Sequence, residues 1–203
     1  TGNFMGIYTI GITGASGSAY ALRLLQILIS EGHHVYLSIS GDGLKIMNDE
    51  AGILLRGSET DIQNEFERQF DAKDGQLRYF DEENMYTPIA SGSTHVDAMV
   101  VVPCSMKALG SIANGISSNL IERAADVTIK EKRKLILVPR ETPLSAIHLR
   151  NMLTLAELGC SIVPAMPGFY HHPKHLQDIV DFVVGRVLDT MGIENSITPR
   201  WGL

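Results

Sequence analysis

The sequence contains little cysteine, no excess of basic residues and no long apolar run. Its two cysteines are too few for a disulfide framework or a four-cysteine zinc site. Acidic residues outnumber basic ones by 23 to 17, and the net charge of −6 argues against a protein that mainly binds nucleic acid. A local cationic pocket remains compatible with this balance. No signal peptide or apolar stretch of membrane-spanning length is visible, so we expect a soluble, cytoplasmic protein.

The composition is that of an ordinary globular domain. Hydrophobic residues make up 44% and charged residues 20% of the 203 residues, which predicts a chain that folds around a core. Because no linker, repeat or low-complexity tract interrupts the sequence, we expect a single domain over residues 1–203. The first residue is Thr1 rather than methionine, and we interpret residues 1–4 as a trimmed, engineered or disordered end.

The hydrophobic pattern predicts strands that alternate with helices. Residues 7–13 form a short β-branched apolar run, residues 14–18 form a glycine turn, residues 19–31 have helical spacing, and residues 34–40 form a second apolar run. A strand, a helix and a second strand in this order predict a βαβ unit, and therefore a parallel sheet. We expect one doubly wound α/β domain with a parallel sheet.

The same alternation continues to the end of the chain. Further strands are predicted at 98–103, 135–138 and 160–163. Further helices are predicted at 106–113, 120–132, 145–158 and 175–191. The stretch 59–92 is polar and less regular, and we interpret it as an excursion that covers a site or a subunit contact.

Glycines, hydroxyls and a few charges follow the predicted strands, where ligands bind in such sheets. The turn at residues 14–18 (GASGS) opens a helix directly after a strand, which favours phosphate binding by backbone N–H groups. It matches neither the G-x-G-x-x-G fingerprint nor the P-loop motif, and an ordinary strand-to-helix turn remains the alternative.

Other chemistries are favoured less by the sequence. Tyr170 and Lys174 have the spacing of a short-chain dehydrogenase pair, but Pro173 opposes the helix that this pair needs.

Cys104 follows a strand, where a lone cysteine is usually a small buried hydrophobe. Ser16 is not in a G-x-S-x-G elbow. The histidines at 171, 172 and 175 lack companion carboxylate or cysteine ligands, so we expect a solvated loop and no metal.

Four cations stand out by their neighbours or their position. Arg123 and Arg186 interrupt mostly apolar helical segments, Arg140 follows a predicted strand, and Lys130 ends a predicted helix. Each one alone is best explained as a surface ion pair. As a set they are equally consistent with an anion pocket, because arginine recognises phosphate through paired hydrogen bonds.

Nine short strings, in order and spacing, resemble the UbiX family of flavin prenyltransferases over nearly the whole chain. They lie at residues 11–17 (GITGASG), 90–93 (ASGS), 102–105 (VPCS), 119–127 (NLIERAADV), 130–133 (KEKR), 137–143 (LVPRETP), 147–149 (IHL), 167–171 (PGFYH) and 199–202 (PRWG). The resemblance implies a Rossmann-like α/β fold of the flavodoxin type with a mainly parallel sheet. It also implies FMN as the flavin and dimethylallyl phosphate as the prenyl donor. It implies transfer of the prenyl group to N5 and C6 of reduced FMN without a metal, a UbiD-type decarboxylase as recipient of the product, and a homododecamer with sites between subunits.

The resemblance also implies roles for individual residues. FMN contacts are implied for Gly14, Ala15, Ser16, Ser40, Ser105, Met106, Lys107, Ala108 and Arg140. Contacts with the prenyl donor are implied for Ser91, Arg123, Lys130, Tyr170, Arg186 and Trp201, with Trp201 in a tail, residues 192–203, that closes the site. Catalytic roles are implied for Ser16, Glu50, Lys130 and Glu141. Of these, Ser16 is a proton relay near N5, and Glu141 passes a proton to the departing phosphate.

Two alternative functions remain. One is an FMN-dependent cysteine decarboxylase, whose catalytic histidine and asparagine-containing substrate loop find no match in this sequence. The other is a non-catalytic flavin-binding subunit, which has no need for cations and Glu141 around a second, small phosphate site.

Overall fold

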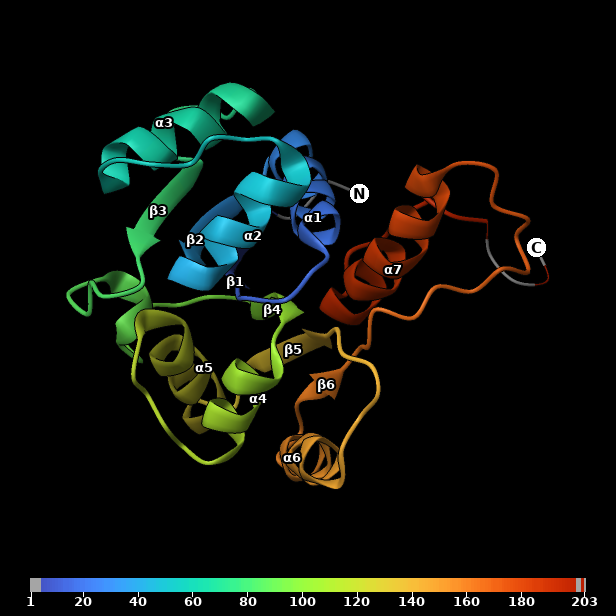
Figure 1. Ribbon diagram of the computed structural model, residues 1–203. Coiled ribbons are helices and arrows are strands. Elements are labelled where there is room, and N and C mark those ends of the chain that lie inside the picture. The colour runs from blue at the N-terminus through green and yellow to red at the C-terminus, as the bar shows by residue number, and fades with distance from the viewer. Residues whose placement is uncertain (1–4, 200–201, 203) are drawn as a thin grey trace.

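A fully parallel sheet forms the centre of the fold. The computed structural model describes residues 5–199 and 202, and within them six strands lie in the order β3-β2-β1-β4-β5-β6, with every neighbouring pair parallel (Figure 1). The strands are β1 (Ile7–Ile12), β2 (His34–Ile39), β3 (Leu77–Asp81), β4 (Ala98–Cys104), β5 (Lys134–Pro139) and β6 (Ser161–Ile162). The predicted doubly wound, Rossmann-like sheet is therefore confirmed.

Helices cover both faces of this sheet. One layer consists of α1 (Ser18–Ser30), α2 (Gly41–Ala51), α3 (Glu59–Phe70) and α7 (Leu176–Met191). The opposite layer consists of α4 (Met106–Ala113), α5 (Leu120–Lys130) and α6 (Ala146–Glu157), joined by the short 3₁₀ helix η1 (Pro88–Ala90) beside α5. None of the described helices is long and apolar enough to span a bilayer.

The apolar run of β4 shows why the sequence pattern indicates a central strand. All seven of its residues are buried. Val100 and Val102 pack into the core on the α1 and α7 side, whereas Met99 and Val101 pack into the core on the α5 side. A strand that is buried on both faces has no polar alternation, which is the signature of a parallel sheet between two helical layers.

Two helices and an edge strand were not predicted. Helix α2 follows β2 directly and begins at Ser40, whose hydroxyl accepts from the Gly43 N–H. The expected irregularity of 59–92 is wrong, because this stretch contains α3, β3 and η1. Helix α3 is polar and buries only Ile62 and Phe66 against the core, so its helical periodicity is weak in the sequence.

The order of the strands fixes where a ligand crevice forms. The chain runs outward from β1 to β3 in one direction and from β4 to β6 in the other. The loops that follow the carboxyl ends of β1 and β4 therefore turn to opposite faces of the sheet. A crevice forms between these two loops. The N-terminal helix α1 covers one face, and α4 covers the other.

Candidate functional site

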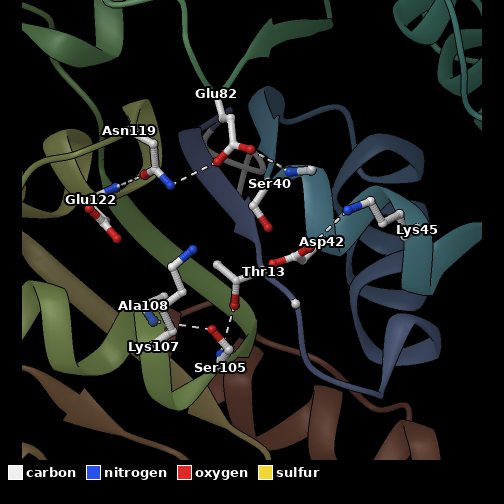
Figure 2. A pocket seen from close by; sticks show the side chains of 12 residues that line it. Thr13, Ser40, Asp42, Lys45, Glu82, Ser105, Lys107, Ala108, Asn119 and Glu122 are labelled. Atoms are coloured by element: carbon white, nitrogen blue, oxygen red, sulfur yellow. Dashed lines mark hydrogen bonds and ion pairs between the residues drawn. The ribbon is translucent and has the colours of Figure 1, made fainter.

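A cavity of about 360 Å³ lies at this crevice (Figure 2). Its size lies within the usual range of small-molecule sites. It is lined by Thr13, Gly14, Ser40, Gly41, Asp42, Lys45, Glu82, Ser105, Lys107, Ala108, Asn119 and Glu122. Five of the predicted flavin contacts, Gly14, Ser40, Ser105, Lys107 and Ala108, are thus brought together at one place.

Thr13 joins the two central strands beneath the cavity. Its hydroxyl donates to the Pro103 carbonyl at 2.9 Å and accepts from the Ser105 N–H at 2.8 Å. Its own N–H also donates to the Pro103 carbonyl, at 3.2 Å. The side chain is buried, so these bonds are shielded from water. Thr13 therefore holds the ends of β1 and β4 at a fixed separation.

Three helices begin at the cavity. Ser40 caps α2, Ser105 caps α4 by accepting from the Ala108 N–H at 3.2 Å, and Asn119 caps α5 by accepting from the Glu122 N–H at 2.9 Å. The first turn of a helix carries partial positive charge from its unpaired N–H groups. Three such ends around one cavity favour an anionic ligand.

The charged side chains of the cavity differ in how they are satisfied. Asp42 and Lys45 form an ion pair at 3.2 Å. Glu82 accepts from the Gly41 N–H, and the buried Glu122 accepts from the Ser118 N–H at 2.8 Å. Within the described part of the chain, the Lys107 ammonium forms no ion pair. Lys107 is thus the cation that is available to a ligand phosphate here.

Gly14 allows the loop after β1 to pass close to α2. A Cβ at this position would lie 2.7 Å from the Asp42 Cβ, well inside van der Waals contact. A side chain at residue 14 would therefore push the loop and α2 apart at the edge of the cavity.

Glu50 binds the start of α1. Its carboxylate accepts from the N–H groups of Gly17 and Ser18, at 3.0 and 2.9 Å. Burial acts to raise the pKa of Glu50, but hydrogen bonds from the Ser16 hydroxyl and from these two N–H groups outweigh it and hold the pKa below its usual value. Gly17 has φ of +124°, which an L side chain rarely adopts. The predicted catalytic pair Ser16 and Glu50 therefore lies together, beside Gly14 and Ala15.

Arg140 ties the end of β5 to the same loop. Its side-chain Nε donates to the Ser16 carbonyl at 3.2 Å, and its backbone N–H donates to the Cys104 carbonyl at 3.4 Å. Glu141 follows and is exposed, with its carboxylate accepting from the Thr142 N–H. Met106 is the first residue of α4, next to the cavity. The predicted flavin contacts Ala15, Ser16, Met106 and Arg140 thus border the cavity without lining it.

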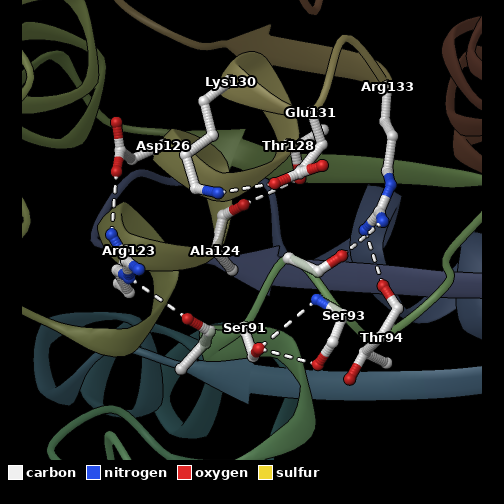
Figure 3. A network of polar contacts seen from close by, with 12 residues as sticks. Ser91, Ser93, Thr94, Arg123, Ala124, Asp126, Thr128, Lys130, Glu131 and Arg133 are labelled. Carbon is white, nitrogen blue, oxygen red and sulfur yellow. Dashed lines mark hydrogen bonds and ion pairs between the residues drawn. The ribbon is translucent and has the colours of Figure 1, made fainter.

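A second group of predicted residues lies on α5 and the turn that packs against it (Figure 3). Arg123 donates to the Ala90 carbonyl at 3.1 Å and pairs with Asp126 at 3.0 Å. Lys130 pairs with Glu131 at 2.5 Å. Ser91 lies in the turn, with its hydroxyl 2.9 Å from that of Ser93. Two of the predicted phosphate cations and Ser91 therefore lie in one polar region beside α5, and both cations are paired with a carboxylate there.

A third group lies beside α7. Arg186 lines a second cavity, of about 590 Å³, between α7 and the segment that follows β6. Tyr170 packs edge-on against Phe182, with ring centroids 5.7 Å apart. Helices α5 and α7 cover opposite faces of the sheet, so Arg123 and Lys130 lie on the other side of it from Arg186. One chain therefore does not bring the four cations together. Trp201 is outside the described residues.

The surroundings of Cys104 and of the pair Tyr170 and Lys174 argue against two of the other chemistries. Cys104 is fully buried, and burial raises the pKa of its thiol to about 12, so it is no activated nucleophile. Tyr170 and Lys174 precede α7, which begins at Leu176, and therefore do not share a helical turn. Among the described residues, no cluster of three histidine, cysteine or carboxylate side chains is placed to hold a metal ion.

Sequence reasoning missed seven residues that line the cavity: Thr13, Gly41, Asp42, Lys45, Glu82, Asn119 and Glu122. Three of them act through partners distant in the chain, since Thr13 binds Ser105, and Glu82 binds Gly41 and Asn119. Two kinds of local signal were available. Thr13 and Glu82 directly follow β1 and β3, and the strings 11–17 and 119–127 contain Thr13 and Asn119.

A Rossmann-like sheet with such a crevice suits a mononucleotide, and the comparison with known families agrees. The sequence model of the Flavoprotein family matches residues 7–188, so this chain is a flavoprotein by family. A flavin prenyltransferase UbiX of Halalkalibacterium halodurans is 47% identical over 199 residues, which cover 98% of this chain and 95% of that protein. The chain therefore belongs to the UbiX family of flavin prenyltransferases.

Two solved structures share the fold over nearly all of the chain. A dodecameric FMN-dependent UbiX-like decarboxylase from Escherichia coli O157:H7 is 40% identical, with a TM-score of 0.83, and the match covers 96% of this chain and 98% of that one. AnUbiX (PadA1), in complex with FMN and dimethylallyl pyrophosphate, is 34% identical, with a TM-score of 0.85 and 98% coverage of both chains.

Proposed function

We propose that this protein binds reduced FMN in the 360 Å³ cavity and transfers a dimethylallyl group from dimethylallyl phosphate to N5 and C6 of the flavin. The observation that carries the proposal is the cavity itself. In a chain of the UbiX family, it combines the positive ends of three helices with the Ser40 and Ser105 side chains. It also contains Lys107, which forms no ion pair with the residues that the structure describes. When bound, reduced flavin supplies the nucleophilic nitrogen, and the protein supplies orientation and charge.

The chain's own residues fit the remaining requirements of the reaction. Breaking the C–O bond of the donor builds negative charge on its phosphate, and arginine and lysine side chains stabilise that charge. We assign this role to Arg123, Lys130 and Arg186. The exposed carboxyl group of Glu141 is assigned to protonate the departing phosphate.

Further roles are assigned to residues around the proposed flavin and donor sites. Ser16, hydrogen bonded to Glu50, is assigned as the proton relay next to the flavin nitrogen. Tyr170, Ser91 and Trp201 are assigned to the prenyl donor, and the tail 192–203 to closing the site. Arg140, which holds the Ser16 carbonyl, is assigned to the flavin.

We further propose that the donor site is completed by a second copy of the chain within a homododecamer. Three observations support this. Arg123 and Arg186 lie on opposite faces of one chain, so a shared phosphate needs two chains. Helix α6 exposes Ile147, Leu149 and Leu153 and buries only Leu155, which is typical of a subunit contact. The related E. coli protein is dodecameric.

The product of this reaction, a prenylated flavin, is proposed to serve a UbiD-type decarboxylase in the cytoplasm. This step rests on the family resemblance and is separate from the chemistry of the cavity.

The decisive experiment is an anaerobic incubation with reduced FMN and dimethylallyl phosphate, followed by mass spectrometry of the released flavin. A mass gain of one prenyl group supports the proposal. A parallel reaction with dimethylallyl pyrophosphate, the ligand of AnUbiX, tests whether the donor needs one phosphate or two. Unchanged flavin with both donors would refute the prenyltransferase, and release of CO₂ from a peptide with a C-terminal cysteine would then favour the decarboxylase alternative.

A further inference from the structure

Glu82 connects three separate elements at the edge of the cavity. It directly follows β3, and its two carboxylate oxygens accept from different helices. Oε1 accepts from the Gly41 N–H at the start of α2, and Oε2 accepts from the Asn119 side chain at the start of α5, at 2.9 Å (Figure 2). Its backbone carbonyl also accepts from the Leu120 N–H at 2.7 Å.

The direction of each of these hydrogen bonds is fixed. The Gly41 N–H is a backbone donor and needs an acceptor. Asn119 uses its Oδ1 to cap α5, where it accepts from the Glu122 N–H, so its NH₂ group points the other way, toward Glu82. A carboxylate, with acceptors on both oxygens and no donor, is the one ionised side-chain type that satisfies both partners at once.

Helices α2 and α5 form opposite walls of the cavity. Gly41, Asp42 and Lys45 line it from α2, and Asn119 and Glu122 line it from the start of α5. The Glu82 carboxylate bridges the first residues of both walls, and its negative charge is favourable at two helix N-termini. The bridge therefore sets the distance between the walls.

We propose that Glu82 is a positioning residue for the flavin: it fixes the width of the cavity by joining α2 to α5, without itself reacting. The ligand named here rests on the proposed function, whereas the bridge is a property of the described residues. In E82Q the new amide keeps the Gly41 bond and turns its NH₂ toward the NH₂ of Asn119. One charge-assisted hydrogen bond is lost, and two donors face each other.

The test measures the dissociation constant of FMN by quenching of flavin fluorescence in four proteins. We expect E82Q to bind about tenfold more weakly than the parent, the factor that one charge-assisted hydrogen bond is worth. The double variant E82Q/N119D reverses the polarity of the bridge: the amide at 82 donates to the carboxylate at 119, which still accepts from the Glu122 N–H. Its affinity should return to near that of the parent.

The fourth protein, E83Q, is the matched control. Glu83 is exposed, lies one residue further along, and gives the same change in net charge. Its FMN affinity should equal that of the parent. Melting temperatures without flavin are recorded for all four proteins, because a purely structural role predicts that they fall and recover without a matching change in affinity.

Several outcomes separate the possibilities. Parent-like FMN binding by E82Q, or a double variant that binds no better than E82Q, overturns the inference. A double variant that regains the melting temperature and not the affinity also overturns it, because Glu82 then only stabilises the fold. A parent protein that binds no FMN overturns the proposed function together with the inference.

Discussion

Replacing Thr13 by valine tests how much the hydrogen bonds that join β1 to β4 stabilise the domain. Valine has nearly the same shape as threonine and lacks the hydroxyl. The change removes the bond to the Pro103 carbonyl and the acceptor of the Ser105 N–H. The Pro103 carbonyl still accepts from the backbone N–H of residue 13. The Ser105 N–H is therefore the group that is left without a partner.

The magnitude follows from that single orphaned donor. A partly buried donor without a partner costs about 1–3 kcal/mol, and we take about 2 kcal/mol for T13V. For a chain of this length that corresponds to a drop in melting temperature of about 4–8 °C. T13S is the matched control, because it keeps both bonds and loses one methyl group, which costs about 1 kcal/mol.

The assay is scanning calorimetry at one fixed protein concentration, since association shifts the melting temperature of an oligomer. T13V should melt several degrees below T13S, and both should melt below the parent. A T13V protein that melts with the parent, or above T13S, would show that the bridge between β1 and β4 contributes nothing.

Four further predictions follow from the site. G14A should weaken FMN binding at least tenfold in a fluorescence titration, because its Cβ would lie 2.7 Å from the Asp42 Cβ. E141Q should keep FMN bound and slow prenylation by about a hundredfold or more in single-turnover assays. Cys104, whose thiol pKa is raised to about 12 by burial, should stay unlabelled by a thiol reagent at pH 8 until the chain unfolds. The pKa of Glu50 is lowered in the folded state. The stability that Glu50 contributes is therefore present above about pH 4.3 and is lost as the pH falls through the folded pKa. In urea unfolding, the free energy of unfolding should fall less between pH 6 and pH 3.5 in E50Q than in the parent.

The strands were predictable where burial is complete. In β1 and β4 nearly every residue is buried, and an unbroken β-branched run leaves no helical alternative. Helices α2 and α3 were missed because each buries only two residues, so neither shows a continuous apolar stripe. The reciprocal capping of Ser58 and Asp61 was the one local signal available for α3.

The grouping of Gly14, Ser40 and Ser105 at one cavity was predictable, because each lies just past the carboxyl end of a strand. The Glu82 bridge was not, since it joins residues 41 and 37 positions away, and such pairs exist only after the sheet has formed. The expected meeting of Arg123 with Arg186 does not occur within one chain, because the two side chains lie on helices that cover opposite faces of the sheet.

The strand order has a consequence for how the protein matures. The first half of the chain supplies Thr13, Gly14 and Ser40 to the cavity, and the second half supplies Ser105 and Lys107. The two halves of the sheet meet where β1 pairs with β4. Neither half alone forms this cavity, so binding of flavin at the proposed site requires that both halves have docked. A ligand that contacts both halves of the sheet binds only when they are joined. It therefore raises the stability of the whole domain rather than of one part.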